Sequence, residues 1–107
     1  MARSQKYTLS YDEATTEHLQ AIEAKYHSLI REVIEEQLQF EPDKETRNRK
    51  PLQRPVAFEA TWELRFGPEN RFRVFYAVSH ERQEVQVLAI GTKERNRLMI
   101  GREEIHL

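Results

Sequence analysis

The stretch WELRFGPENRFRVFYAV, residues 62–78, decides the fold, because it has the pattern of a β-hairpin. Apolar and polar residues alternate on either side of the turn residues GPEN, which favours two antiparallel strands. Since side chains alternate between the two faces of a sheet, the apolar residues of both strands must share one face. This requirement predicts the register: Phe66 lies opposite Phe72, and Arg65 lies opposite Arg73.

Two arginines directly opposite each other on one face of a sheet admit two interpretations. Like charges across a strand pair disfavour the sheet by only ~0.2–1 kcal/mol, so solvent can offset the repulsion, with Glu63 or Glu94 as the paired carboxylate. Alternatively, Arg65 and Arg73 form a clamp on one phosphate, because their forked donors match phosphate oxygens. The sequence alone leaves both interpretations open.

Outward from the hairpin, the chain predicts a single α+β domain over residues 1–107. Residues 13–40 contain neither Gly nor Pro and have apolar residues at helical spacing. One helix of that length would be long for this domain, so a helical hairpin that turns near residues 24–28 is favoured. The predicted order is β-α-α-β-β-β, with the helical pair on one face of a small, mainly antiparallel sheet. The predicted strands are residues 5–11, 58–66, 71–78 and 84–91.

The composition excludes several kinds of site. The chain has no cysteine, which rules out disulfides, thiolate chemistry and cysteine-based zinc sites. The N-terminal residues lack the apolar segment of a secretory signal. No run approaches the roughly 20 apolar residues that a membrane span needs. We therefore expect a cytoplasmic protein.

The net charge of −1 hides an asymmetry between the two parts of the chain. Residues 1–41 carry four Lys/Arg and eight Asp/Glu (net −4), whereas residues 42–107 carry thirteen and ten (net +3). A basic sheet face with basic loops suits a nucleic-acid backbone, although a mixed solvated surface is the simpler interpretation. The basic residues are Lys44, Arg47, Arg49, Lys50 and Arg54 before the hairpin, and Lys93, Arg95 and Arg97 after the last strand.

Three segments resemble the RelE/ParE family of bacterial toxins from type II toxin–antitoxin pairs. They are LIREVIEEQLQFEPDKETRNRKPL, WELRFGPENRFRVFYAV and VQVLAIGTKERNRLMIGREEI, and the likeness spans nearly the whole chain. The resemblance implies a RelE-like fold, a toxin neutralised by a partner antitoxin, and no cofactor. In the RelE branch, the activity is metal-independent cleavage of mRNA on the ribosome, in which the ribose 2′-OH attacks the adjacent phosphate.

The resemblance also implies roles for individual residues. Arg65 matches the phosphate-stabilising arginine of the family, and Lys93 falls where the branch has a catalytic arginine. Met99 stands about where the branch often has a tyrosine and cannot transfer a proton, so His80 or His106 becomes the candidate base. The predicted catalytic residues are Arg65, Arg73, Lys93 and Lys50, and the predicted RNA-binding residues are Arg47, Arg49, Arg95 and Arg97.

Three functions remain open at this point. The first is a ribosome-dependent mRNA endoribonuclease, the second a ParE-like inhibitor of DNA gyrase without catalysis, and the third an inactive antitoxin-binding member. Each implies an antitoxin that covers the apolar C-terminal tail, the outer side of the helical hairpin or the arginine face. The alternative for the tail is that Met99, Ile100 and Ile105 simply belong to the core.

Overall fold

The computed structural model describes residues 5–53 and 59–106, so the predicted Phe58 and Arg54 lie outside the described residues. No helix in these ranges is long and apolar enough to cross a membrane. The helices are α1 (Ala14–Gln20) and α2 (His27–Leu38), with short 3-10 turns η1 (Ala24–Tyr26) and η3 (Pro68–Asn70). The strands are β1 (Thr8–Tyr11), β2 (Arg49–Pro51), β3 (Trp62–Phe66), β4 (Phe72–Ser79), β5 (Glu84–Glu94), β6 (Arg97–Ile100) and β7 (Glu103–Ile105).

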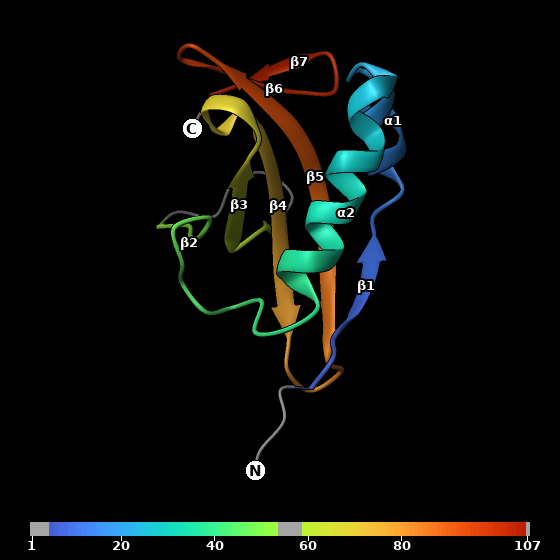
Figure 1. Cartoon of the computed structure of the whole chain (residues 1–107), viewed down its shortest axis with the longest axis vertical. Coiled ribbons are helices and arrows are strands. Elements are labelled where there is room, and N and C mark those ends of the chain that lie inside the picture. The colour runs from blue at the N-terminus through green and yellow to red at the C-terminus, as the bar shows by residue number, and fades with distance from the viewer. Residues whose placement is uncertain (1–4, 54–58, 107) are drawn as a thin grey trace.

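All these strands form one sheet in the order β2-β3-β4-β5-β6-β7, with antiparallel neighbours (Figure 1). β1 pairs in parallel with residues 84–87 of β5, and β6 pairs with residues 91–94 of the same long strand. The hairpin register is confirmed, because Phe66 pairs with Phe72 and Arg65 pairs with Arg73. The predicted α+β class is also confirmed.

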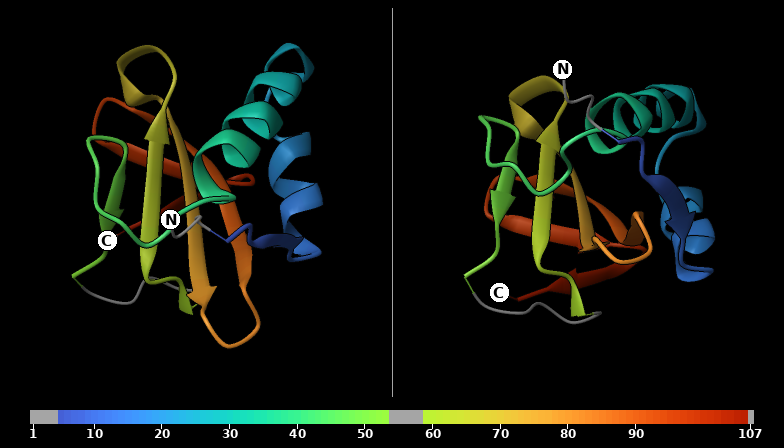
Figure 2. Two further views of the ribbon diagram at one scale, coloured as in Figure 1. Left: turned by 60° about the horizontal axis from the view of Figure 1, so that its bottom comes forward. Right: turned by 90° about the horizontal axis from the view of Figure 1, so that it is seen from below.

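The two helices cover one face of the sheet (Figure 2). Their inward side chains pack against the apolar face of the hairpin, as the alternation in the sequence requires. Tyr76 lies at the centre and is fully buried. This cluster contains Ile22, Ile30, Ile34, Leu38, Leu64, Phe66, Phe72, Val74, Tyr76, Val85, Val87 and Ile90.

The opposite face of the sheet has a second core, which the C-terminal strands β6 and β7 provide. Leu98 and Ile100 of β6 pack with Phe75 of β4, and Ile105 of β7 lies against the same cluster. The apolar tail is therefore core at these positions. β5 is covered on both faces, as its nearly continuous apolar sequence predicts. The sequence did not reveal β2, β6 and β7 as strands.

The helical hairpin is confirmed, although the chain leaves α1 a few residues earlier than predicted. α1 ends at Gln20 and α2 begins at His27, with η1 between them. The His27 Nε2 atom lies 2.8 Å from the Ile22 carbonyl oxygen and links the two sides of the break. This bond gives the turn a fixed geometry without Gly or Pro.

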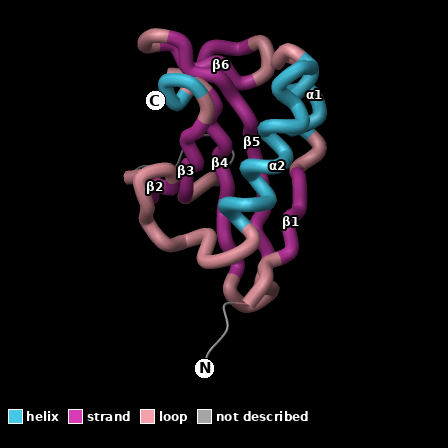
Figure 3. Tube along the Cα trace, viewed as in Figure 1, coloured by secondary structure: helices cyan, strands magenta, loops and turns pink. Residues whose placement is uncertain are grey.

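The connection from α2 to β2 is a long loop (Figure 3) that polar contacts tie to the body. Arg49 donates from Nη1 to the Gln37 carbonyl at 2.5 Å and from Nε to the Lys44 carbonyl at 3.1 Å. The Tyr76 hydroxyl donates to the Pro42 carbonyl at 2.6 Å. Buried carbonyls of the loop and of the helix end are thereby satisfied.

Candidate functional site

The two arginines of the hairpin lie on the same face of the sheet and converge on one carboxylate. Arg65 Nε lies 2.5 Å from Glu63 Oε1, and Arg73 Nη1 lies 3.5 Å from Glu63 Oε2. The Glu63 side chain is 4 % exposed. Glu63 is therefore the anion that the two arginines share in this structure, as the first of the two interpretations has it, and phosphate binding by the pair stays a prediction.

The two arginines differ in their access to solvent. The Arg65 side chain is 41 % exposed and the Arg73 side chain is 9 % exposed. Arg73 also donates from Nε to the Asn70 carbonyl at 2.9 Å, which fixes it against the β3–β4 turn. Burial lowers the pKa of Arg73, Glu63 opposes this shift, and the neighbouring charge of Arg65 adds to it. Arg73 is thus a buried cation with two partners, whereas Arg65 is partly exposed and its side chain is paired with Glu63.

An open cavity of about 600 Å³ lies beside Arg73, between the β3–β4 turn and the β5–β6 turn. It brings together two residues predicted as catalytic, Arg73 and Lys93, with Arg95, which was predicted to bind RNA. Arg65 does not line the cavity but stands opposite Arg73 on the next strand. The cavity is lined by Pro68, Glu69, Arg71, Arg73, Lys93, Glu94 and Arg95.

Arg71 is a fourth cation at this cavity, and the sequence reasoning missed its role. Its guanidinium carbon lies 5.4 Å from the ring centre of Tyr26 and 5.6 Å from that of Phe72. Its Nη2 lies 3.0 Å from Glu94 Oε1. Its Nε is buried and has no hydrogen-bond partner within the described part of the chain. The residue is therefore held by aromatic and ionic contacts at the rim, with one donor unused.

The β2 strand and its loop contribute less to this site than predicted. Arg49 is 9 % exposed and its guanidinium bonds to the end of α2, which indicates a structural role, while its predicted part in RNA binding stays a prediction. Lys50 pairs with Glu63 across β2 and β3, so both side chains lie on the same face of the sheet. The Lys50 Nζ atom lies 3.5 Å from Glu45 Oε2. Arg47 is exposed and does not line the cavity.

Arg97 and Met99 do not line the cavity beside Arg73. Arg97 Nε donates to Glu104 Oε1 at 2.8 Å, so it belongs to the outer hairpin. Met99 pairs with Thr92, so their side chains share one face of the sheet. The side chain of Lys93, the next residue, lies on the opposite face. Met99 instead lines a smaller cavity, of about 220 Å³, next to His18. The position that the resemblance links to a catalytic tyrosine is thus turned away from Arg73 and Lys93.

Neither candidate histidine reaches the cavity. His80 follows the far end of β4, roughly 20 Å from Arg73 at ~3.3 Å per residue. There its Nδ1 lies 2.8 Å from the Tyr7 hydroxyl, and its Nε2 lies 2.6 Å from Asp43 Oδ2. His106 is exposed and 3.5 Å from Glu104. Among the described residues, no cluster of three or more His, Asp or Glu is arranged to hold a metal ion.

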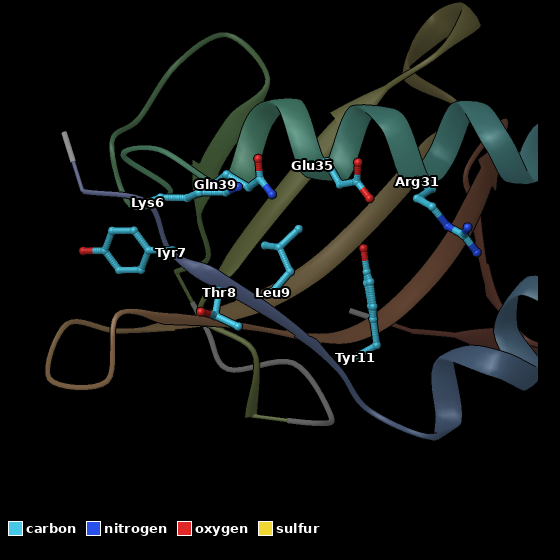
Figure 4. A pocket seen from close by; sticks show the side chains of 8 residues that line it. All are labelled: Lys6, Tyr7, Thr8, Leu9, Tyr11, Arg31, Glu35 and Gln39. Carbon is cyan, nitrogen blue, oxygen red and sulfur yellow. The ribbon is translucent and has the colours of Figure 1, made fainter. Parts of the chain in front are cut away.

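A further cavity, of about 690 Å³, lies between β1 and α2 (Figure 4). Tyr11 points towards Glu35 and Arg31 of the helix in that view. Burial raises the pKa of the Tyr11 hydroxyl, Glu35 raises it further, and Arg31 opposes the shift. The charges here are mixed, so this cavity lacks the concentration of cations seen at Arg73. It is lined by Lys6, Tyr7, Thr8, Leu9, Tyr11, Arg31, Glu35 and Gln39.

Comparison with known proteins bears on the fold. No family model and no curated protein sequence matches the chain. Among solved structures, the chain is similar to a chain of the RelBE2 toxin–antitoxin complex from Mycobacterium tuberculosis, with a TM-score of 0.67 and 22 % sequence identity. The match covers 90 % of this chain and 99 % of that chain. The predicted RelE-like fold is therefore confirmed: the protein has the fold found in that toxin–antitoxin complex.

Proposed function

We propose that this chain is the toxin of a toxin–antitoxin pair and that it cleaves mRNA on the ribosome. The observation that carries the proposal is the cavity where Arg71, Arg73, Lys93 and Arg95 meet on the RelE-like fold. Four cations around one opening suit a polynucleotide backbone rather than a neutral ligand. A protein antitoxin is the expected partner, because the structural neighbour is a toxin–antitoxin complex.

The cations of this cavity would contribute stabilisation of negative charge during RNA cleavage. When a ribose 2′-OH attacks the adjacent phosphate, negative charge grows on the phosphate oxygens. Arg73 is preorganised to stabilise that charge, because its Nε is fixed on the Asn70 carbonyl while its side chain lines the cavity. Lys93 is exposed and has no ion pair within the described residues, so its full charge is available to the phosphate.

Expression of the wild type and of Lys93→Ala tests the proposal. Lys93 is the suitable residue because its backbone N–H, not its side chain, bonds to the Arg71 carbonyl at 2.7 Å, so the fold is retained. The wild type should arrest growth and produce cuts in cellular mRNA that primer extension detects. Lys93→Ala should reduce the cuts at least tenfold, about the value of one charge-assisted contact.

Lys6→Ala is the matched control, since Lys6 is an exposed lysine at the separate β1–α2 cavity. It should cut mRNA like the wild type. Growth arrest without mRNA cuts would contradict cleavage and leave inhibition of a protein target such as gyrase. Absence of growth arrest would contradict a toxin function altogether.

A further inference from the structure

Glu63 is a buried carboxylate inside an otherwise cationic site. Its side chain is 4 % exposed, and both oxygens are engaged by arginines, at 2.5 Å for Arg65 and at 3.5 Å for Arg73. A buried charge is retained only where partners compensate its lost hydration. Here the partners are two cations that stand directly opposite each other on β3 and β4 and would otherwise repel.

We propose that Glu63 is an internal competitor that regulates phosphate binding at this site. In the free protein, Glu63 takes the place of a phosphate between the two arginines and offsets part of their charge. When a phosphodiester enters the cavity beside Arg73, Arg65 leaves Glu63 and binds the phosphate, while Arg73 keeps its contact with Glu63. The inference rests on the proposed function only in taking the ligand to be a phosphodiester.

The exposure of the two arginines explains why Arg65 is the residue that moves. The Arg65 side chain is 41 % exposed and has no hydrogen bond or ion pair other than that with Glu63 within the described residues, so it can turn towards solvent. Arg73 is 9 % exposed and is held by both Glu63 and the Asn70 carbonyl. Because Arg73 keeps its contact with Glu63 while Arg65 binds the phosphate, each arginine then has its own anion and the buried carboxylate is never left unpaired.

Glu63→Gln tests the inference, because glutamine keeps the shape of the side chain and removes its charge. We expect this variant to bind a short, fluorescein-labelled single-stranded RNA about tenfold more tightly than the wild type, the value of one charge-assisted contact. The slope of log K against log salt should stay the same, since Arg65 contacts the phosphate in both complexes and the gain comes from the lost bond to Glu63. Fluorescence anisotropy measures both quantities.

Glu45→Gln is the matched control. Glu45 also forms an ion pair near this face, with Lys50 at 3.5 Å, but its side chain is 59 % exposed. Removing its charge should change RNA affinity less than twofold, because exposed pairs contribute little. Equal gains for the two variants would mean that net charge alone matters, and would overturn the inference. Unchanged or weaker RNA binding by a folded Glu63→Gln protein would overturn it too.

A measurement on the wild type keeps the test decisive if Glu63→Gln fails to fold. Addition of inorganic pyrophosphate or of the same RNA should shift the Arg65 Nε–H resonance in ¹⁵N NMR spectra, because the bond to Glu63 is exchanged. An Arg65 resonance that stays fixed while Lys93 responds would overturn the inference. The growth assay judges the proposed function separately: tighter binding without mRNA cuts would refute cleavage and leave the competition by Glu63 intact.

Discussion

Arg49 offers a direct test of the difference between a binding arginine and a structural one. Its side chain donates to the carbonyls of Gln37, in the last turn of α2, and of Lys44, in the following loop. Each hydrogen bond from a charged donor contributes roughly 1.5–3 kcal/mol, and a cation at a helix C-terminus adds about 0.3–1 kcal/mol. Arg49→Met keeps most of the buried volume and removes both bonds.

We expect Arg49→Met to lower the free energy of unfolding by about 3–5 kcal/mol. A domain of this size has only ~5–15 kcal/mol in total, so the melting temperature should fall by roughly 12 °C or more. Urea denaturation followed by the fluorescence of Trp62, the single tryptophan of the chain, measures the loss. The slope of the transition should stay constant, because the surface exposed on unfolding is unchanged.

Arg47→Met is the control, two residues away on the same loop. Arg47 is exposed, and no hydrogen bond or ion pair of its side chain is seen in the described residues, so stability should change by less than about 0.5 kcal/mol. If Arg49→Met is as stable as Arg47→Met, the structural role assigned to Arg49 is refuted. Lower RNA affinity in a folded Arg49→Met protein with full stability would support the predicted role of Arg49 in RNA binding.

Three further predictions concern the core. Tyr76→Phe leaves the Pro42 carbonyl without its donor, and should cost about 1–3 kcal/mol in the same urea titration. Burial lowers the pKa of His18 in the folded protein below its ordinary value of about 6.5. The unfolded chain therefore binds a proton more readily than the folded one, so the free energy of unfolding should fall as the pH drops below about 6.5. His18→Gln should remove that part of the pH dependence of the melting temperature. Gly91→Ala should lower the melting temperature, by overpacking of ~1–3 kcal/mol, because the new Cβ would lie 2.5 Å from the Met99 carbonyl oxygen.

The sequence by itself determined the hairpin and the helical face. A period of two between residues 62 and 78 leaves one register in which both apolar faces meet, and the structure has that register, including Arg65 opposite Arg73. The absence of Gly and Pro from residues 13–40, with apolar residues at helical spacing, likewise determined a pair of helices. These features depend on local periodicity, which a sequence displays directly.

Tertiary structure alone decided how the charges are used. Nothing in the spacing of Arg49 distinguishes it from Arg47, yet the fold buries one and exposes the other, because only Arg49 lies beside the free carbonyls at the end of α2. The return of β6 over the second face turned Met99 away from Lys93. Charged side chains are long and find partners across strands, so their contacts depend on which segments the fold brings together.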